Sequence, residues 1–566
     1  MNLFKRKSKS NNNTGFRLEL EVTGMTCASC ATHVEDALRK IAGVVEARVP
    51  AWQKNKALVQ TEGDIAPEML TNAVEKAGYR AKFVETGRVG RKSSQNGGNR
   101  NIDYDLVVIG TGGGGMASAI RACEIGARVA IVDAGTIGGT CVNIGCVPSK
   151  TLIRAAEAFH IAGHHPFAGV NTKAESIDWS AVRAQKDALV GELRQQKYVD
   201  VLQSYKNITL IQGWAKLDEN GDVVVNGQTL RTGKVVIATG AKPKRLSLPG
   251  IEKVNVLDST SLMAVETLPQ SLIVIGGRAV ALELGQAFAR FGVKVTILQR
   301  SKRIVPEHEP EIGKALTDFL RQEGIIVETN ATPLAIREEN GEKIVSAIAR
   351  GEQREFRAEQ VIMAVGRTPN TKDMDLEKAA VNLDKKGFII VDEYLKTSNP
   401  KIYAVGDVTT LPEFVYVAAA AGGIAAENAL NSNSTKLDLS VLPSVIFTDP
   451  QIATVGLTEA QARENEFDVK ISNLPLEYVP RALATRNTRG FIKLVADRKT
   501  ARLLGAHVLA SEGGEIIQTA ALAVKFGSQQ GFTVADLRSM LFPYLTQVEG
   551  LKLAALTLEK DVAKLS

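Results

Sequence analysis

The residues most able to do chemistry are two cysteines five positions apart, Cys141 and Cys146. They stand in the run Gly138-Gly139-Thr140-Cys141-Val142-Asn143-Ile144-Gly145-Cys146-Val147-Pro148-Ser149-Lys150. Thiols at this spacing near a predicted helix start can form a disulfide or present thiolates of lowered pKa. Beside a redox cofactor, such a pair can accept two electrons and become a dithiol. The run therefore predicts a redox centre rather than two buried, unreactive cysteines.

Another pair of thiols, Cys27 and Cys30, lies in the run Gly24-Met25-Thr26-Cys27-Ala28-Ser29-Cys30. A helix is predicted to begin there, and its N-terminus stabilises thiolates. Two soft thiolates on a loop suit linear or trigonal binding of Hg(II) or Cu(I), whereas a tetrahedral zinc site needs four ligands. We therefore expect this pair to bind a soft metal. The fifth cysteine, Cys123, falls on an Ala-rich helix and is expected to be a small core residue.

A glycine-rich turn follows the apolar run 106–109, with Gly110, Gly112 and Gly115 at GxGxxG spacing. An Ala-rich helix comes next, and a second apolar strand ends in Asp133. Such glycines let the backbone approach a pyrophosphate at a helix N-terminus, and an acid about 20 residues further on can hold ribose hydroxyls. Strand, turn, helix, strand and acid in this order predict a dinucleotide site.

A second motif of this kind leads from an apolar strand into Gly276, but Arg278 stands where the middle glycine of the fingerprint is expected. The following strand ends at Arg300, where a site for NAD favours an acid, and Lys302 and Arg303 come next. A missing acid together with nearby cations suits the 2′-phosphate of NADPH. We therefore expect NADPH rather than NADH at this second site.

The formal net charge of +7 is concentrated in two segments, 1–15 and 86–101, which carry basic residues and no acidic ones. We interpret these segments as a tail and a linker, and expect no nucleic-acid partner. The sequence has no apolar run of about 18 residues, and its start lacks the apolar core of a secretory signal. Five cysteines are too few for a disulfide framework, and close cysteine pairs in a cytosolic chain are typical of metal-binding or redox sites. We therefore expect a cytoplasmic protein without membrane insertion.

The run around Cys141 resembles the redox-active segment of the flavoprotein disulfide reductases, which include glutathione reductase, dihydrolipoamide dehydrogenase and mercuric reductase. The resemblance covers about residues 102–566 and implies FAD. It implies that Cys141 exchanges with substrate, that Cys146 lies against the flavin, and that Lys150 pairs with Glu283 near flavin N5. Further positions expected at the flavin are Thr140, the turn Ala238-Thr239-Gly240, Arg367 within 364–370, and Asp407 within 402–407, whose carboxylate would bond the ribityl chain.

The substrate class depends on the segment around Pro543. Dithiol reductases of this family place a His before this proline and a Glu after it, because a base must shuttle the thiol proton. Here these positions hold Phe542 and Gln547, and none of the six His lies after His507. Reduction of Hg(II) held by thiolates needs no such base. The segments 447–451, 542–546 and 548–552 resemble mercuric reductases, which implies that Tyr544 helps hold the metal across a homodimer interface.

Residues 16–85 show the strand and helix order βαββαβ, which predicts a two-layer ferredoxin-like domain. With its cysteine pair, this segment resembles heavy-metal-associated domains. Mercuric reductases usually end in adjacent cysteines that pass the metal inward, whereas this sequence ends at Ser566 without them. Either the chain is truncated, or Cys27 and Cys30 hand metal more directly to Cys141. A second tyrosine of that family is Val256 here.

These patterns together predict an α/β protein with two doubly wound dinucleotide-binding domains and an α+β dimerisation domain, preceded by the ferredoxin-like domain. The expected divisions are a disordered basic tail (1–15), a heavy-metal-associated domain (16–85), a linker (86–101), an FAD-binding domain in two parts (102–250 and 367–441), an NADPH-binding domain (251–366) and a dimerisation domain (442–566).

The function that we expect is the reduction of Hg(II)-thiol complexes to Hg(0), with membrane mercury transporters as possible metal donors. Two alternatives stay open from the residues alone. One is another flavin disulfide reductase that acts on lipoamide or a small thiol. The other is a metal-trafficking protein whose flavin core is vestigial.

Overall fold

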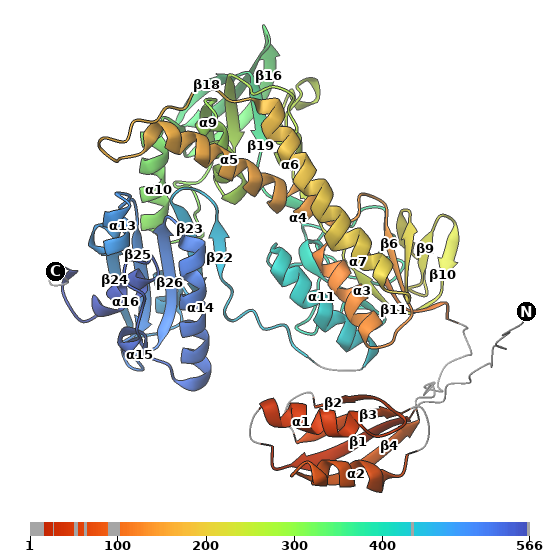
Figure 1. Cartoon of the computed structure of the whole chain (residues 1–566). Coiled ribbons are helices and arrows are strands. Elements are labelled where there is room, and N and C mark those ends of the chain that lie inside the picture. Colours follow the sequence, from red (N-terminus) through yellow and green to blue (C-terminus); the bar gives the residue numbers. More distant parts are fainter. Residues whose placement is uncertain are drawn as a thin grey trace, which may run out of the picture. The chain divides into compact units, whose positions relative to one another are not determined.

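The computed structural model describes residues 16–25, 28–49, 55–61, 65–88, 102–431 and 435–562 (Figure 1). The predicted tail, most of the predicted linker and Cys27 lie outside the described residues. The chain divides into two compact units, Met1–Arg100 and Asn101–Ser566.

The first unit has the predicted βαββαβ order and forms one antiparallel sheet, β2-β3-β1-β4. Its elements are β1 (Phe16–Thr23), α1 (Ala28–Arg39), β2 (Val44–Arg48), β3 (Lys56–Thr61), α2 (Pro67–Lys76) and β4 (Arg80–Arg88). Alternate residues of β1, Leu18, Leu20 and Val22, are buried against Val34 and Leu38 of α1. Period-two strands that bury one face against helices form the two-layer fold that the sequence predicts.

The second unit begins with a parallel sheet of order β21-β11-β5-β6-β7. Its strands are β5 (Tyr104–Ile109), β6 (Val129–Asp133), β7 (Ile208–Gln212), β11 (Thr232–Ile237) and β21 (Ile402–Ala404). One face packs on α3 (Gly113–Glu124) and α11 (Val415–Leu430), and the other on a small sheet of β8 (Ala215–Leu217), β9 (Val223–Val225) and β10 (Gln228–Leu230). Coverage of both faces explains why β5 and β6 are continuous apolar runs.

Another parallel sheet follows, of order β15-β14-β13-β19. Its strands are β13 (Ser271–Ile275), β14 (Lys294–Gln299), β15 (Ile326–Thr329) and β19 (Gln360–Met363). The helices α9 (Ala279–Arg290) and α10 (Pro310–Gln322) share one core with it, and the antiparallel strands β16 (Ala331–Glu339), β17 (Glu342–Ala349) and β18 (Glu352–Ala358) share another. The short strands β12 (Ala241–Pro243) and β20 (Arg367–Pro369) pair where the chain enters and leaves this region.

Beyond residue 442 the pattern changes to an antiparallel sheet of order β22-β23-β26-β25-β24. Its elements are β22 (Ser444–Ile446), β23 (Gln451–Gly456), β24 (Val469–Pro475), β25 (Phe491–Asp497) and β26 (Leu503–Ala510), with α14 (Gly513–Gln530), α15 (Val534–Ser539) and α16 (Glu549–Leu556). Shorter elements of the second unit are η3 (Ile251–Lys253), α8 (Ser259–Leu262), η4 (Gly406–Val408), α12 (Glu459–Glu464), η5 (Leu476–Tyr478) and α13 (Pro480–Ala484). The predicted fold class is confirmed.

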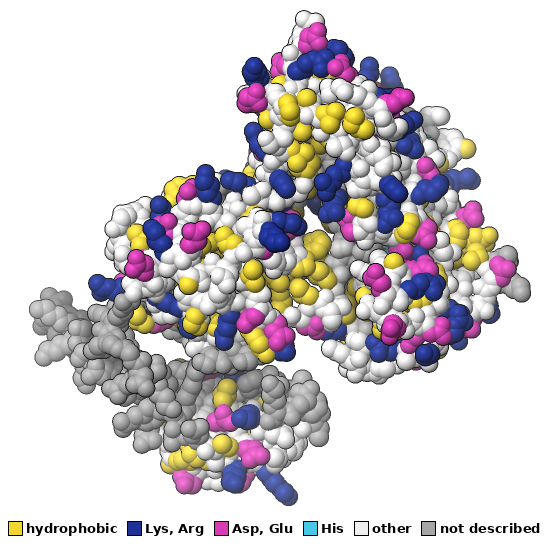
Figure 2. Space-filling view, turned by 180° about the vertical axis from the view of Figure 1, so that it is seen from behind, with side chains coloured by type: hydrophobic (Ala, Val, Ile, Leu, Met, Phe, Trp, Pro, Cys, Tyr) yellow, Lys and Arg dark blue, Asp and Glu magenta, His cyan; other side chains and the backbone are white. Residues whose placement is uncertain are grey.

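A run of helices connects β6 to β7 in the first parallel sheet (Figure 1). They are α4 (Gly139–Ile144), α5 (Cys146–His164), α6 (Trp179–Arg194), a π-helical turn η2 (Gln195–Val199) and α7 (Asp200–Ser204). Among the described residues, no helix is long and apolar enough to cross a bilayer. Basic and acidic side chains are interspersed on the face seen in Figure 2, and hydrophobic side chains gather in one hollow there.

Candidate functional site

The two thiols of the predicted redox centre lie at a break between α4 and α5. Cys141 is in α4, Gly145 ends that helix, and Cys146 is the first residue of α5. A Cβ atom on Gly145 would lie 2.9 Å from the carbonyl oxygen of Thr140 and 3.2 Å from Cys141 Cα, so only glycine fits the break. The break places Cys146 at the N-terminus of a 19-residue helix. The helix dipole there favours a thiolate.

The two thiol groups share one proton. A hydrogen bond from Cys141 lowers the pKa of Cys146 to about 6, and the charge of Lys150 adds to this effect against burial and the charge of Glu283. The same hydrogen bond raises the pKa of Cys141, as do burial and the neighbouring thiolate. Near neutral pH the pair is therefore a Cys146 thiolate that accepts a hydrogen bond from the Cys141 thiol.

The predicted partner of Lys150 is in place. Lys150 Nζ lies 2.6 Å from Glu283 Oε2, and Glu283 is 6% exposed. The other carboxylate oxygen of Glu283 accepts the backbone N–H of Phe447 at 2.9 Å, and Lys150 Nζ lies 4.7 Å from the centre of the Phe447 ring. A buried carboxylate with two donors holds the ammonium group in one position beside the thiol pair.

One face of α9 continues this network toward the antiparallel sheet. Gln286 Nε2 donates to the carbonyl of Asp449 and Gln286 Oε1 accepts its N–H, both at 2.8 Å. Arg290 contacts the Asp449 carboxylate at 2.7 Å and Glu323 at 2.8 Å. Burial works against the charge of Asp449, but Arg489 and Arg290 outweigh it and lower its pKa. Sequence reasoning missed this cluster, whose only signal was polar residues three to four positions apart on an apolar helix.

The first glycine motif has the predicted strand–turn–helix geometry. Gly110 has φ 108°, and a Cβ on it would lie 2.4 Å from the carbonyl oxygen of Ala238. A Cβ on Gly115 would lie 1.9 Å from the carbonyl oxygen of Gly110. Gly112 caps α3, and a Cβ on Gly139 would lie 2.6 Å from its Cα. The helix N-terminus is therefore open to a close backbone approach by a phosphate.

Asp133 ends β6 as predicted, and its carboxylate is partly occupied by the same turn. Its Oδ2 accepts the backbone N–H of Thr111 at 2.7 Å and the Thr111 hydroxyl at 2.5 Å, and its Oδ1 accepts the N–H of Gly135 at 2.7 Å. A carboxylate offers about four acceptor positions. One position on Oδ1 is left for a ribose hydroxyl.

The other predicted flavin positions gather at the return of the chain to the first parallel sheet. Thr239 Oγ1 donates to the carbonyl of Asn370 at 2.8 Å. The N–H of Asn370 in turn donates to the carbonyl of Gly240 at 2.9 Å. Arg367 Nε is buried without a hydrogen bond and lies 3.5 Å from Asp407 Oδ2. Burial raises the pKa of Asp407, and the Arg367 charge opposes it. The glycine cradle and this unsatisfied donor fit FAD.

The second glycine motif also fits a dinucleotide. Gly276 has φ 132°, and a Cβ on it would lie 2.2 Å from the carbonyl oxygen of Ala364. Arg278 caps α9 and lies 3.5 Å from Glu307. Arg303 points inward and donates to the carbonyls of Pro306 and His308, at 2.7 and 3.1 Å. Arg300 and Lys302 are exposed, so these two are the cations available to a 2′-phosphate.

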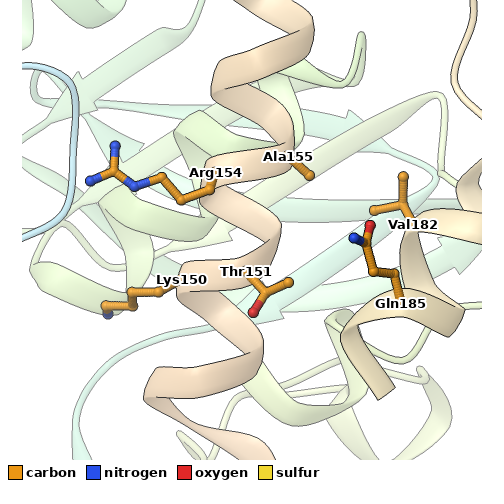
Figure 3. Close-up of a pocket in the computed structure, with 6 residues that line it drawn as sticks. All are labelled: Lys150, Thr151, Arg154, Ala155, Val182 and Gln185. Atoms are coloured by element: carbon orange, nitrogen blue, oxygen red, sulfur yellow. The ribbon is translucent and has the colours of Figure 1, made fainter. Parts of the chain in front are cut away.

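A pocket of about 500 Å³ lies between α5 and α6 (Figure 3). Lys150 and Arg154 extend from one side of α5, one helical turn apart, and Thr151 and Ala155 from another. The remaining lining residues, Val182 and Gln185, come from α6. Lys150 therefore borders both the thiol pair and this pocket.

Tyr544 lies in the loop that follows α15. In this loop the Thr546 hydroxyl donates a hydrogen bond to the carbonyl of Pro543, and the N–H of Leu545 donates one to the Glu549 carboxylate. Its side chain is 72% exposed. Val256, at the position of the second expected tyrosine, is 5% exposed and packs in an apolar core. Within one chain, none of the contacts among described residues joins Tyr544 to the thiol pair.

Of the first cysteine pair, Cys27 lies outside the described residues. Cys30 is in the first turn of α1, half-buried against the core of the first unit. Met25, five positions earlier in the sequence, is buried. A thiol at the start of a helix is in the position that the sequence predicts for it.

Three family models match the chain: "Pyridine nucleotide-disulphide oxidoreductase" over residues 104–422, its dimerisation domain over 442–555, and "Heavy-metal-associated domain" over 19–80. The chain belongs to the pyridine nucleotide-disulphide oxidoreductases. It is 44% identical to mercuric reductase from Lysinibacillus sphaericus over 97% of this chain and 99% of that one. It is 43% identical to mercuric reductase from Shigella flexneri, with the same coverage. Within the family, it therefore belongs with the mercuric reductases.

Solved structures agree with this assignment. The HOCl-induced flavoprotein disulfide reductase RclA from Escherichia coli is 29% identical, with a TM-score of 0.72, and the match covers 80% of this chain and 99% of that one. A Cu(II) complex of the same protein is 30% identical with a TM-score of 0.70.

Proposed function

We propose that this protein reduces thiolate-bound Hg(II) to Hg(0) at the Cys141–Cys146 pair, with NADPH as the electron source and FAD as the carrier. The observation that carries this proposal is the polarised thiol pair beside the Lys150–Glu283 ion pair. Phe542 and Gln547, at the positions of the proton-shuttling His and Glu, favour a metal substrate over a disulfide.

FAD, when bound, would accept a hydride from NADPH and supply an electron pair to the thiol site. Gly110, Gly112, Gly115 and Asp133 would hold its ADP part, and Arg367 and Asp407 would lie at its ribityl chain. Thr140 and the turn 238–240 would line the same site. At the second site, Gly276 would admit the pyrophosphate of NADPH, and Arg300 would bind its 2′-phosphate.

The thiols do the chemistry of exchange and reduction. Cys141 is the thiol that receives mercury from a solution thiolate, and Cys146 is the second ligand that completes a linear site. Two electrons then convert Hg(II) to Hg(0), and both sulfurs are released as thiolates. Lys150 keeps the Cys146 sulfur anionic, and Glu283 fixes Lys150, so the pair acts as a soft bidentate ligand near neutral pH.

The protein is proposed to act as a homodimer, because Tyr544 is exposed on the dimerisation domain and would complete the site of the partner chain. Cys27 and Cys30 would collect Hg(II) in the cytoplasm from thiol complexes or from membrane transporters. The segment that joins them to Asn101 would raise their effective concentration near Cys141.

The test is Hg(II)-dependent oxidation of NADPH in excess thiol, with volatile mercury recorded at the same time. We expect one Hg(0) per NADPH, and loss of turnover in Cys146→Ala. Absence of volatile mercury from the unaltered protein, or full activity of Cys146→Ala, would contradict the proposal. Faster turnover of glutathione disulfide or lipoamide than of Hg(II) would favour a disulfide reductase, the class to which RclA belongs by name.

A further inference from the structure

One helical run beside the thiol pair contains a turn of π-helix. α6, η2 and α7 are continuous from Trp179 to Ser204, and the π-turn covers Gln195–Val199. Fewer than about 1% of residues lie in π-helices, and single π-helical turns are frequent at functional sites. The wider turn changes the direction of the side chains within it, and one of these is Tyr198.

Tyr198 packs against the loop that leads into α4. A Cβ on Gly138 would lie 3.4 Å from Tyr198 Cδ2 and 2.6 Å from Val142 Cγ1. Gly138 has φ 102°, in the left-handed region that glycine adopts without strain. The ring of Tyr198 therefore lies at the N-terminus of α4, three residues before Cys141.

A polar contact holds the two segments together near this point. Arg194 Nη1 donates to Asn143 Oδ1 at 3.2 Å. The amide nitrogen of Asn143 in turn donates to the carbonyls of Ile137 and Gly139, both at 2.9 Å. The helix that carries Tyr198 is thus tied to the loop and the helix that carry Cys141.

The phenol of Tyr198 is electrostatically coupled to the thiol pair. Burial raises the pKa of its phenol, and the charges of Cys141 and Cys146 raise it further. The phenol oxygen is therefore within electrostatic range of both sulfurs. Its side chain remains only half-buried, so it also borders solvent.

We propose that Tyr198 is a further specificity-determining residue, whose ring forms one wall beside Cys141 and limits the size of the thiol that arrives with Hg(II). This inference rests on the proposed function. In the exchange, the Cys141 sulfur bonds to mercury as one bond from mercury to a solution thiol breaks. The departing thiolate takes the proton that Cys141 releases, and no electron moves. A wall at this sulfur hinders bulky departing thiols more than small ones.

The experiment compares Hg(II) complexes of cysteine and of glutathione as substrates of the full-length protein. The measured quantity is the glutathione-to-cysteine ratio of kcat/KM in the wild type, Tyr198→Ala and Tyr198→Phe. Tyr205→Ala, at the residue directly after this helical run, is the matched control. We expect Tyr198→Ala to raise the ratio about tenfold, because a removed ring opens space worth more than one methylene. Tyr198→Phe and Tyr205→Ala should leave it within about twofold.

Stopped-flow rates of exchange of the two complexes onto the reduced pair give the same ratio without turnover. If the wild type exchanges mercury but releases no Hg(0), the proposed function is overturned. The role of Tyr198 is then decided by the exchange ratio alone. An exchange ratio equal in all four proteins, or changed as much by Tyr205→Ala, would overturn the role of Tyr198. If Tyr198→Ala loses FAD, Tyr198→Leu takes its place, with the ratio expected to rise about threefold.

Discussion

Lys493 Nζ lies 2.9 Å from Glu309 Oε2, and both side chains are 2% exposed. Two further carboxylates contact the same ammonium group, Glu311 at 2.9 Å and Glu459 at 3.0 Å. The carboxylate oxygens of the three acids are close enough to hold a metal ion, but Lys493 contacts all three. Because Glu309 and Glu311 begin α10 while Lys493 is in β25, this cluster joins the second parallel sheet region to the antiparallel sheet.

Lys493→Met is expected to destabilise the second unit strongly. It leaves the Glu309 carboxylate buried without its cation, which costs about 3–5 kcal/mol in comparable buried pairs. Urea unfolding followed by circular dichroism measures the change. Lys314→Met is the control, since Lys314 is 82% exposed in its pair with Asp318 and such pairs contribute about 0–1 kcal/mol. Equal losses in the two variants would contradict this role of Lys493, and adding Glu309→Gln to Lys493→Met should restore part of the lost stability.

Lys150→Met and Glu283→Gln are expected to move the pKa of Cys146 in opposite directions. The charge of Lys150 lowers this pKa and that of Glu283 raises it. In the reduced wild type, Cys146 is a thiol below about pH 6 and a thiolate above it. Lys150→Met should shift the midpoint upward, toward the ordinary thiol value of about 8.5, and Glu283→Gln should shift it downward. Far-ultraviolet thiolate absorbance, with Cys146→Ser as the blank, measures both, and shifts of the same sign would contradict this account.

The fold and the centre of the site follow from local sequence signals, whereas the long-range polar contacts do not. Apolar runs such as 106–109 predict parallel strands because both of their faces are buried. The resemblance of the motif around Cys141 to the flavoprotein disulfide reductases implies Lys150 and its partner. Lys493 and Glu309 are 184 positions apart, and no spacing rule links the start of a helix to a strand of a separate sheet. Tyr198 escapes prediction for another reason, since its direction depends on a π-turn that side-chain periodicity does not reveal.

Arg300→Ala is expected to reduce the preference for NADPH. Arg300 and Lys302 are exposed after β14, and Arg303 is engaged with backbone carbonyls. Loss of one charged contact to the 2′-phosphate should raise KM for NADPH about tenfold, which corresponds to about 1.4 kcal/mol. KM for NADH should not change, and only the NADPH value should depend on ionic strength. Lys314→Ala serves as the control, and equal kcat/KM for the two nucleotides in the wild type would contradict the assignment.

Tyr544 is expected to act across the dimer interface. Because its side chain is 72% exposed, Tyr544→Phe should change the free energy of unfolding by less than about 0.5 kcal/mol. The Tyr544→Phe homodimer should nevertheless turn over Hg(II) about tenfold more slowly, since each site loses one hydroxyl contact.

Hybrid dimers separate action across the interface from action within one chain. A chain with Cys141→Ala is coexpressed with a chain that carries Tyr544→Phe, and the heterodimer is purified with two different tags. If Tyr544 serves the partner's thiols, the only site with an intact pair receives the tyrosine of the Cys141→Ala chain. The heterodimer should then show about half the wild-type kcat per dimer, although each parent homodimer is nearly inactive or slow. If Tyr544 served its own chain, that site would lack the hydroxyl, and the heterodimer would be no faster per intact site than the Tyr544→Phe homodimer.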